Sequence, residues 1–203
     1  MNSAHPSSKF SFSTAKPVED RVHVWTLQKL ILSEAEVRFG PMNPAKKLFR
    51  PEFVDNGPHI INTPSFDGGF AGLSMNAASY WPAFIWGLSH ETVHLLDPDV
   101  AGAPYLEEGF CDFFAIEMAA PIHGVPSSRP YAYVEAERLV RFAFNSPYDA
   151  ARQIRERFGR LRDATAQGMC ELFPDIPLEV IHALLRRHEG RMMQSSSSVP
   201  QAV

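Results

Sequence analysis

The sequence predicts an α+β domain in which one helix and a small mixed sheet precede a mainly helical C-terminal part. Apolar residues recur at helical spacing in residues 22–39 and again in several stretches beyond residue 104. Residues 41–79 are rich in Pro, Gly and Asn, which is typical of short strands joined by turns. Residues 81–96 form a largely apolar run with a proline near each end. This order of elements, a helix, a small sheet and then mostly helices, is typical of an α+β chain.

The first helix is predicted over Val22–Phe39, where the chain reaches a Gly-Pro pair. Its apolar side is formed by Leu27, Leu30, Ile31 and Val37. Two strands are predicted at His59–Thr63 and Phe70–Met75, joined across the Asp-Gly-Gly sequence at 67–69. The short loop between them favours direct pairing of the two strands.

The second helix is predicted over about 81–96. Pro82 suits the first turn of a helix, and Pro98 disfavours helical backbone at the residue before it. The remaining helices are predicted near 105–119, 130–144, 148–172 and 177–189. The helices therefore account for most of the chain after the predicted sheet.

The composition indicates one globular domain. The chain has 203 residues, 45% of them hydrophobic, a net charge of −4 and two cysteines. We expect a domain over 19–189 between disordered tails at 1–18 and 190–203, the second of which contains four consecutive serines. The charge favours neither nucleic acid nor a membrane as a partner, and two cysteines with no apolar leader or membrane-length run favour a cytoplasmic protein.

The motif that carries chemistry is His90-Glu91-Thr92-Val93-His94, the pattern H-E-x-x-H. Two histidines four residues apart on a helix lie on one face, one turn apart, and together they can hold a metal ion. Glu91 lies about a quarter turn away, where a carboxylate serves as a base rather than a ligand. Since the helix is largely apolar, burying these groups without a partner would be costly.

A catalytic zinc site needs a third protein ligand. The helix predicted over 105–119 carries Glu108 and Asp112 on one face, so Glu108 is the predicted ligand and Asp112 accepts a hydrogen bond from a ligating imidazole. Glu107 is the second choice and Glu117 the third. The metzincin pattern is excluded, because Asp97 and Val100 stand where it needs Gly and His.

The motif and the run Leu106-Glu107-Glu108-Gly109-Phe110-Cys111 resemble the gluzincins, zinc peptidases with two His and one Glu as ligands. The closest resemblance is to the small bacterial peptidase-MA-like group, and it covers roughly residues 58–165. The pairing of a glutamate with an aspartate four residues later is similar to that of thermolysin-type enzymes. The resemblance implies a zincin-like fold and Zn²⁺ as the cofactor. Cys111 replaces a small alanine, which we expect to affect packing only.

The run Tyr131–Phe142 resembles the next helix of the same group. The resemblance implies that a tyrosine there donates a hydrogen bond to the oxyanion. Tyr133 is placed at that position and Tyr131 is the alternative, although either ring could simply pack against Phe142 and Phe144.

The expected function is a zinc-dependent hydrolase, a peptidase acting on a peptide or protein with Glu91 as general base. A strand near 71–76, including Gly72 and Asn76, could align the substrate as an edge strand, or could merely cover the core. His123 could line the cleft, or could be an ordinary residue of a surface loop.

Two other readings remain open at this point. Two histidines and a carboxylate also form the metal site of non-haem iron oxygenases, so the same residues could support hydroxylation. The site could also be inactive in a metal-binding interaction module, but an intact Glu91 argues against it. Metal analysis distinguishes the zinc hydrolase from the iron oxygenase, and the effect of replacing Glu91 distinguishes the hydrolase from the inactive module.

Overall fold

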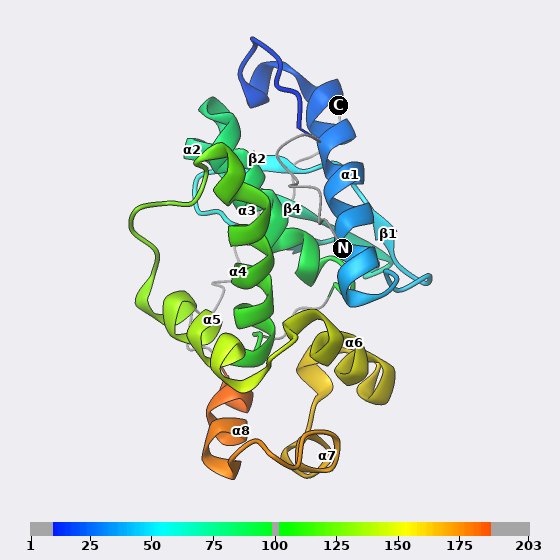
Figure 1. Cartoon of the computed structure of the whole chain (residues 1–203). Helices are drawn as coiled ribbons and strands as arrows, with labels where there is room; N and C mark the ends of the chain where they lie inside the picture. The colour runs from blue at the N-terminus through cyan, green and yellow to red at the C-terminus, as the bar shows by residue number, and fades with distance from the viewer. Residues whose placement is uncertain (1–9, 99–101, 188–203) are drawn as a thin grey trace.

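The computed structural model describes residues 10–98 and 102–187. Figure 1 shows α3 and α4 side by side through the middle of the molecule, with α1 on one side and α5 on the other. The helices are α1 Arg21–Phe39, α2 Met75–Ser79, α3 Trp81–His94, α4 Tyr105–Ala119, α5 Tyr131–Ala143, α6 Pro147–Phe158, α7 Ala166–Leu172 and α8 Leu178–Leu185, with short 3₁₀ turns at Pro17–Glu19, Ala120–Ile122 and Leu161–Asp163. A small sheet and mainly helices confirm the mixed α and β content.

The sheet is built around β4 (Gly68–Ser74). Strands β1 (Lys47–Leu48) and β2 (Glu52–Val54) pair with it in parallel, and β3 (His59–Asn62) pairs with it antiparallel. The predicted pairing of the 59–63 and 70–75 strands is confirmed. The predicted exposed edge near 71–76 is wrong, because β4 has a neighbour on both sides.

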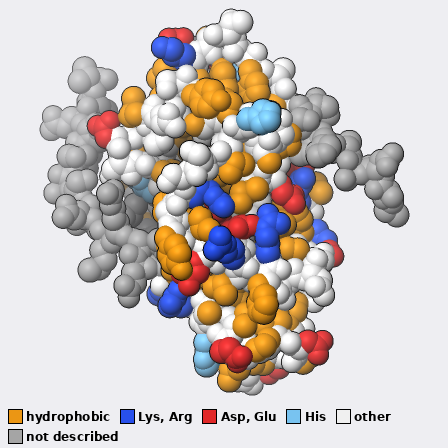
Figure 2. Space-filling model, turned by 60° about the vertical axis from the view of Figure 1, so that its left-hand side comes forward, with side chains coloured by type: hydrophobic (Ala, Val, Ile, Leu, Met, Phe, Trp, Pro, Cys, Tyr) orange, Lys and Arg blue, Asp and Glu red, His pale blue; other side chains and the backbone are white. Residues whose placement is uncertain are grey.

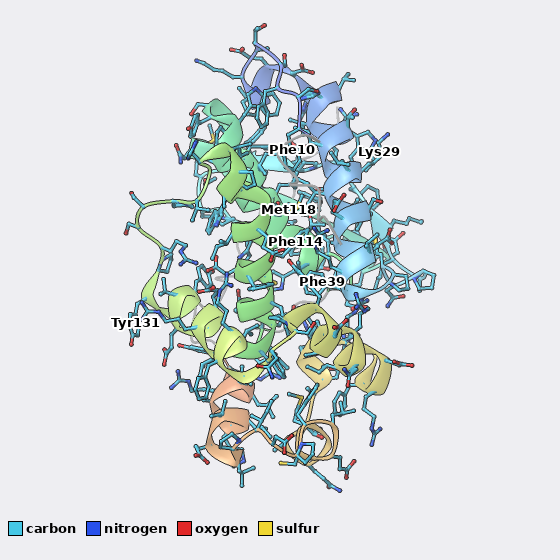
Figure 3. All side chains as sticks on the ribbon, in the orientation of Figure 1. Phe10, Lys29, Phe39, Phe114, Met118 and Tyr131 are labelled. Atoms are coloured by element: carbon cyan, nitrogen blue, oxygen red, sulfur yellow. The ribbon has the colours of Figure 1, made fainter. Side chains whose placement is uncertain are left out.

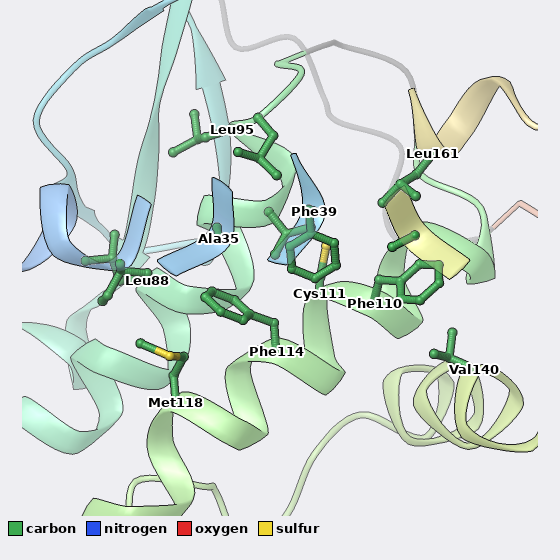
Figure 4. Close-up of a cluster of buried hydrophobic side chains, with 14 of the residues drawn as sticks. Ala35, Phe39, Leu88, Leu95, Phe110, Cys111, Phe114, Met118, Val140 and Leu161 are labelled. Carbon is green, nitrogen blue, oxygen red and sulfur yellow. The ribbon is translucent and has the colours of Figure 1, made fainter. Parts of the chain in front are cut away.

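The core lies where α3 and α4 pack against each other, with α1 and β4 covering α3. Its largest buried side chains include Phe39 from α1, Leu88 from α3, and Phe110, Phe114 and Met118 from α4. Figure 4 shows these residues converging from separate elements. The ring of Phe39 meets both Phe110 and Phe114 edge-on, at centroid distances of 6.2 and 5.7 Å. The core therefore fixes how α4 is placed against α1 and α3.

Most predicted helix positions agree with the structure. The first helix and the 105–119 and 130–144 helices lie within one residue of their predicted ends, and α3 ends at His94, two residues early. The predicted 148–172 helix is wrong, because the chain breaks at Gly159, whose φ is +84°, and resumes as α7. The predicted 177–189 helix is shorter, ending at Leu185.

The segment just before α1 corrects part of the predicted N-terminal tail. The Trp81 indole donates hydrogen bonds to the carbonyls of Ser13 and Ala15, and the ring of Phe12 stacks on it at 6.0 Å. Residues 10–18 thus pack on the start of α3. The rest of that tail, 1–9, and the predicted tail at 190–203 lie outside the described residues.

The described surface agrees with the mixed charge of the sequence. Figure 2 shows basic and acidic side chains beside one another among hydrophobic atoms on one face. Within residues 10–98 and 102–187, no helix is both long and apolar enough to cross a membrane.

The contribution of the core can be tested at Phe114. Replacing this fully buried ring with alanine should lower the free energy of unfolding by about 3–5 kcal/mol, because it removes apolar contacts and leaves a cavity. Phe142→Ala is the matched control, since Phe142 is 74% exposed and should cost less than about 0.5 kcal/mol. Urea unfolding of both variants measures the difference, and equal costs would contradict this description of the core.

Candidate metal centre

The H-E-x-x-H residues lie in the last turns of helix α3, and all five are buried. Pro82 lies in its first turn, and the helix ends directly after the motif, at His94. On the side facing α1, Gln28 donates a buried hydrogen bond of 3.1 Å to the hydroxyl of Thr92. The histidines face α4 instead, because their ring nitrogens meet its carboxylates.

Helix α4 supplies Glu107, Glu108, Cys111 and Asp112 from its first two turns, all of them buried. The close approach of α5 is possible because Gly109 has no side chain. A Cβ atom there would lie 2.4 Å from the carbonyl oxygen of Ala136. The glycine therefore sets the distance between α4 and α5 beside the candidate ligands.

The carboxylate of Glu108 lies between the two histidines. Its Oε2 atom is 3.1 Å from Nε2 of His90 and 3.5 Å from Nε2 of His94. Around a tetrahedral zinc ion, nitrogen and oxygen ligands at about 2.0–2.2 Å from the metal lie about 3.3–3.5 Å apart. The distance to His94 thus matches the spacing that zinc requires, and the distance to His90 is about 0.2 Å shorter.

The ionisation of this group depends on the two histidines. Burial would raise the pKa of Glu108, but the charges and hydrogen bonds of His94 and His90 hold it well below its usual value. The pKa of each imidazole is in turn raised by its acidic neighbours, against the effect of burial. Without a metal, protonated imidazoles and an ionised carboxylate stabilise one another.

The second nitrogen of His94 also meets a carboxylate. Its Nδ1 lies 2.6 Å from Oε1 of Glu107, which also forms an ion pair with Arg162. The Arg162 Nε donates a second hydrogen bond of 2.9 Å to Oε2 of Glu107. Glu107 therefore contacts Nδ1 of His94 and orients its ring, whereas Glu108 lies near Nε2 on the opposite side of the ring.

The second nitrogen of His90 faces Asp112. The two atoms, Nδ1 of His90 and Oδ1 of Asp112, are 4.0 Å apart, and each is buried without a hydrogen-bond partner among the described residues. The other oxygen of Asp112 is held by Arg129. The arrangement is similar to that at His94, but at 4.0 Å from His90, Asp112 does not form the predicted hydrogen bond to a ligating imidazole.

The charges of the cluster fit a divalent cation. Its four buried carboxylates, Glu91, Glu107, Glu108 and Asp112, face two arginines, Arg129 and Arg162. Metal ligation requires neutral imidazoles, which leaves two negative charges unbalanced. A zinc ion supplies the two positive charges, so both the donor set and the charge agree with a metal.

Glu91 lies beside the ligand set and outside it. The residue is 3% exposed. Burial raises its pKa, and the attraction of His90 and His94 offsets only part of that rise. His59 of β3 also interacts with the charge of Glu91. No feature of the sequence around His59 indicated this proximity, since it arises only when β3 packs on α3.

The structure distinguishes the two candidate tyrosines. The ring of Tyr133 lies 5.2 Å from that of His90, and burial together with the charges of Glu108 and Glu91 raises the pKa of its hydroxyl. Tyr131 is 77% exposed and lies at the outer edge of α5 (Figure 3). Tyr133 is thus the one that α5 brings to the centre.

Cys111 is a potential ligand that our reading of the sequence assigned to packing. One ligand atom each of His90, His94 and Cys111 lies within 4.8 Å of the other two. Burial raises the pKa of the thiol to about 12, despite the attraction of His94. The signal was available, because Cys111 lies one turn from Glu108 on the same helix face.

The weaker predicted contacts lie in β4, in α2 and in the loop after α4. Gly72 is buried inside the sheet, where a Cβ atom would lie 2.8 Å from Ile61. Asn76 is exposed on α2, and His123 is exposed in a loop beyond the far end of α4. The third-choice ligand, Glu117, accepts a hydrogen bond from Tyr148 instead. Asp97, which follows α3, pairs with Arg155 at 2.9 Å.

Comparison of the chain with models of known protein families, with curated proteins and with solved structures finds no match. The interpretation of the cluster therefore depends on its geometry and on the chemistry of its residues.

The spacing of α4 and α5 can be tested at Gly109. Gly109→Ala should destabilise the protein by about 1–3 kcal/mol, because the added methyl group overlaps the backbone of α5. Gly87→Ala is the control, since a Cβ atom there meets only Leu73 at 3.6 Å and alanine favours a helix. Thermal unfolding should show opposite shifts for the two variants. Equal stability of Gly109→Ala and the parent chain would contradict the close approach.

The role of the outer ion pairs can be tested at Arg162. Arg162→Ala should weaken zinc binding roughly 10–100-fold, because Glu107 then loses the group that fixes it against His94. Arg157→Ala is the control, because the side chain of Arg157 is 55% exposed and pairs with Glu171 on α7. Competition with a chelator of known affinity measures both, and unchanged affinity in Arg162→Ala would remove the positioning role.

Proposed function

We propose that this protein is a zinc-dependent metallohydrolase of the zincin-like type, and that it cleaves peptide bonds. His90, His94 and Glu108 would hold the metal. The observation that carries the proposal is the carboxylate oxygen of Glu108 at 3.1 and 3.5 Å from two imidazole nitrogens of an H-E-x-x-H helix. The buried Glu91 beside these ligands favours hydrolysis over a purely structural site, since a structural site needs no base.

A zinc ion bound there would polarise a carbonyl oxygen and make a water molecule acidic enough to attack it. Glu91 takes a proton from the attacking water and returns it to the leaving amine. Its burial supports this role, because desolvation raises the pKa of the carboxyl from its ordinary value towards neutrality. The ion pair of Glu107 and Arg162 keeps the imidazole of His94 oriented while this proton moves.

Tyr133 is suited to bind the substrate carbonyl oxygen as it gains negative charge. Its ring lies against His90, and its raised pKa keeps the hydroxyl protonated at neutral pH. A neutral hydroxyl donates a hydrogen bond that strengthens as the oxygen becomes an anion. The strand β4 has no free edge, so it is not part of the proposed substrate site.

The base is tested by Glu91→Gln. This change keeps the size of the side chain and removes its ability to accept a proton, so peptide hydrolysis should fall by roughly 10²–10⁴-fold while zinc stays bound. Glu179→Gln, on the exposed side of α8, is the control and should leave the rate unchanged. Mass-spectrometric detection of cleaved peptides, with metal content measured in parallel, gives both readouts. Full activity of Glu91→Gln, or activity with iron alone, would overturn the proposal.

The oxyanion donor is tested by Tyr133→Phe. Loss of this hydroxyl should lower kcat by roughly 10²–10³-fold with little change in metal affinity. Tyr131→Phe is the natural control, because Tyr131 is two residues away on the same helix and exposed. Steady-state kinetics of the two variants would contradict the assignment if both, or neither, lost activity.

A further inference from the structure

We propose that Cys111 is a sulfur ligand of the metal centre, so that the bound ion is held by His90, His94, Glu108 and Cys111. The inference extends the proposed function by naming a fourth ligand, and it depends on that proposal only for the presence of a metal.

The thiol of Cys111 lies close to both histidines. A ligand atom of Cys111 lies within 4.8 Å of one on His90 and one on His94. Thiolate and imidazole ligands of one tetrahedral zinc ion lie about 3.5–3.6 Å apart. These three ligand atoms are therefore close enough together to hold one metal ion.

Helix α4 carries Glu108 and Cys111 on one face. Glu108 and Cys111 are three residues apart, so both side chains leave the same face of the helix towards α3. Phe110 and Phe114 of the same helix lie in the core beside Cys111 (Figure 4). The helix therefore presents one carboxylate and one thiol together to the two imidazoles.

A sulfur ligand also restricts which metal the centre can hold. A thiolate together with two imidazoles favours zinc over magnesium, calcium and manganese, which prefer oxygen ligands. Four protein ligands also complete a tetrahedral shell. A centre with Cys111 in place is closed at rest, and hydrolysis needs one ligand to move aside when substrate binds.

X-ray absorption at the zinc edge of the zinc-loaded full chain tests the ligand directly. We expect one sulfur neighbour at about 2.3 Å together with nitrogen and oxygen neighbours at about 2.0–2.2 Å. Cys111→Ser should lose the sulfur neighbour and weaken zinc binding by more than tenfold. Cys170→Ser is the matched control, because Cys170 lies on α7 outside the cluster. It should keep the sulfur neighbour and the zinc affinity of the parent chain.

Two results would overturn the inference. One is a wild-type spectrum with nitrogen and oxygen neighbours only, which needs no variant and so does not depend on whether Cys111→Ser folds. The other is failure of the chain to bind zinc. A sulfur neighbour in a protein that hydrolyses nothing would support Cys111 while removing the proposed function. Hydrolysis that depends on Glu91, in a protein whose spectrum shows no sulfur neighbour, would support the proposed function and remove Cys111 as a ligand.

Discussion

The carboxylate of Glu108, held between two imidazole nitrogens in the protein interior, is the interaction on which the rest of the centre depends. Burying an unpaired charge is costly, and removing one partner of a buried pair typically costs about 3–5 kcal/mol. The protein offsets that cost with opposing charges, and Arg129 and Arg162 balance two of the other carboxylates. A divalent cation would balance the remaining two. The same set of charges thus stabilises the buried cluster and would favour a divalent cation between α3 and α4.

The packing of the helices makes this cluster possible. Helix α3 presents its histidines to α4, and α4 is fixed in turn by aromatic residues such as Phe39 and Phe114. Gly109 lets α5 approach closely enough for Tyr133 to reach His90. Apolar contacts outside the site therefore determine distances within it, and small residues matter as much as charged ones.

Much of this arrangement could be predicted from local patterns. The spacing of His90 and His94, and the glutamate and aspartate of α4, follow from helical periodicity alone. What could not be predicted depends on contacts between distant segments, such as Arg162 behind Glu107 or Trp81 against residues 10–18. The helix break before α7 was missed because one glycine, Gly159, interrupts an otherwise helical pattern. Gly68 and Gly69, expected as a turn, instead belong to a strand that has partners on both sides.

The central claim is that the space between α3 and α4 binds one metal ion. Anomalous diffraction from crystals of the zinc-loaded protein, recorded above and below the zinc edge, tests it most directly. The account predicts a single peak within bonding distance of Nε2 of His90, Nε2 of His94 and the carboxylate of Glu108. A peak on Glu107 or Asp97, or no peak between these two helices, would contradict it.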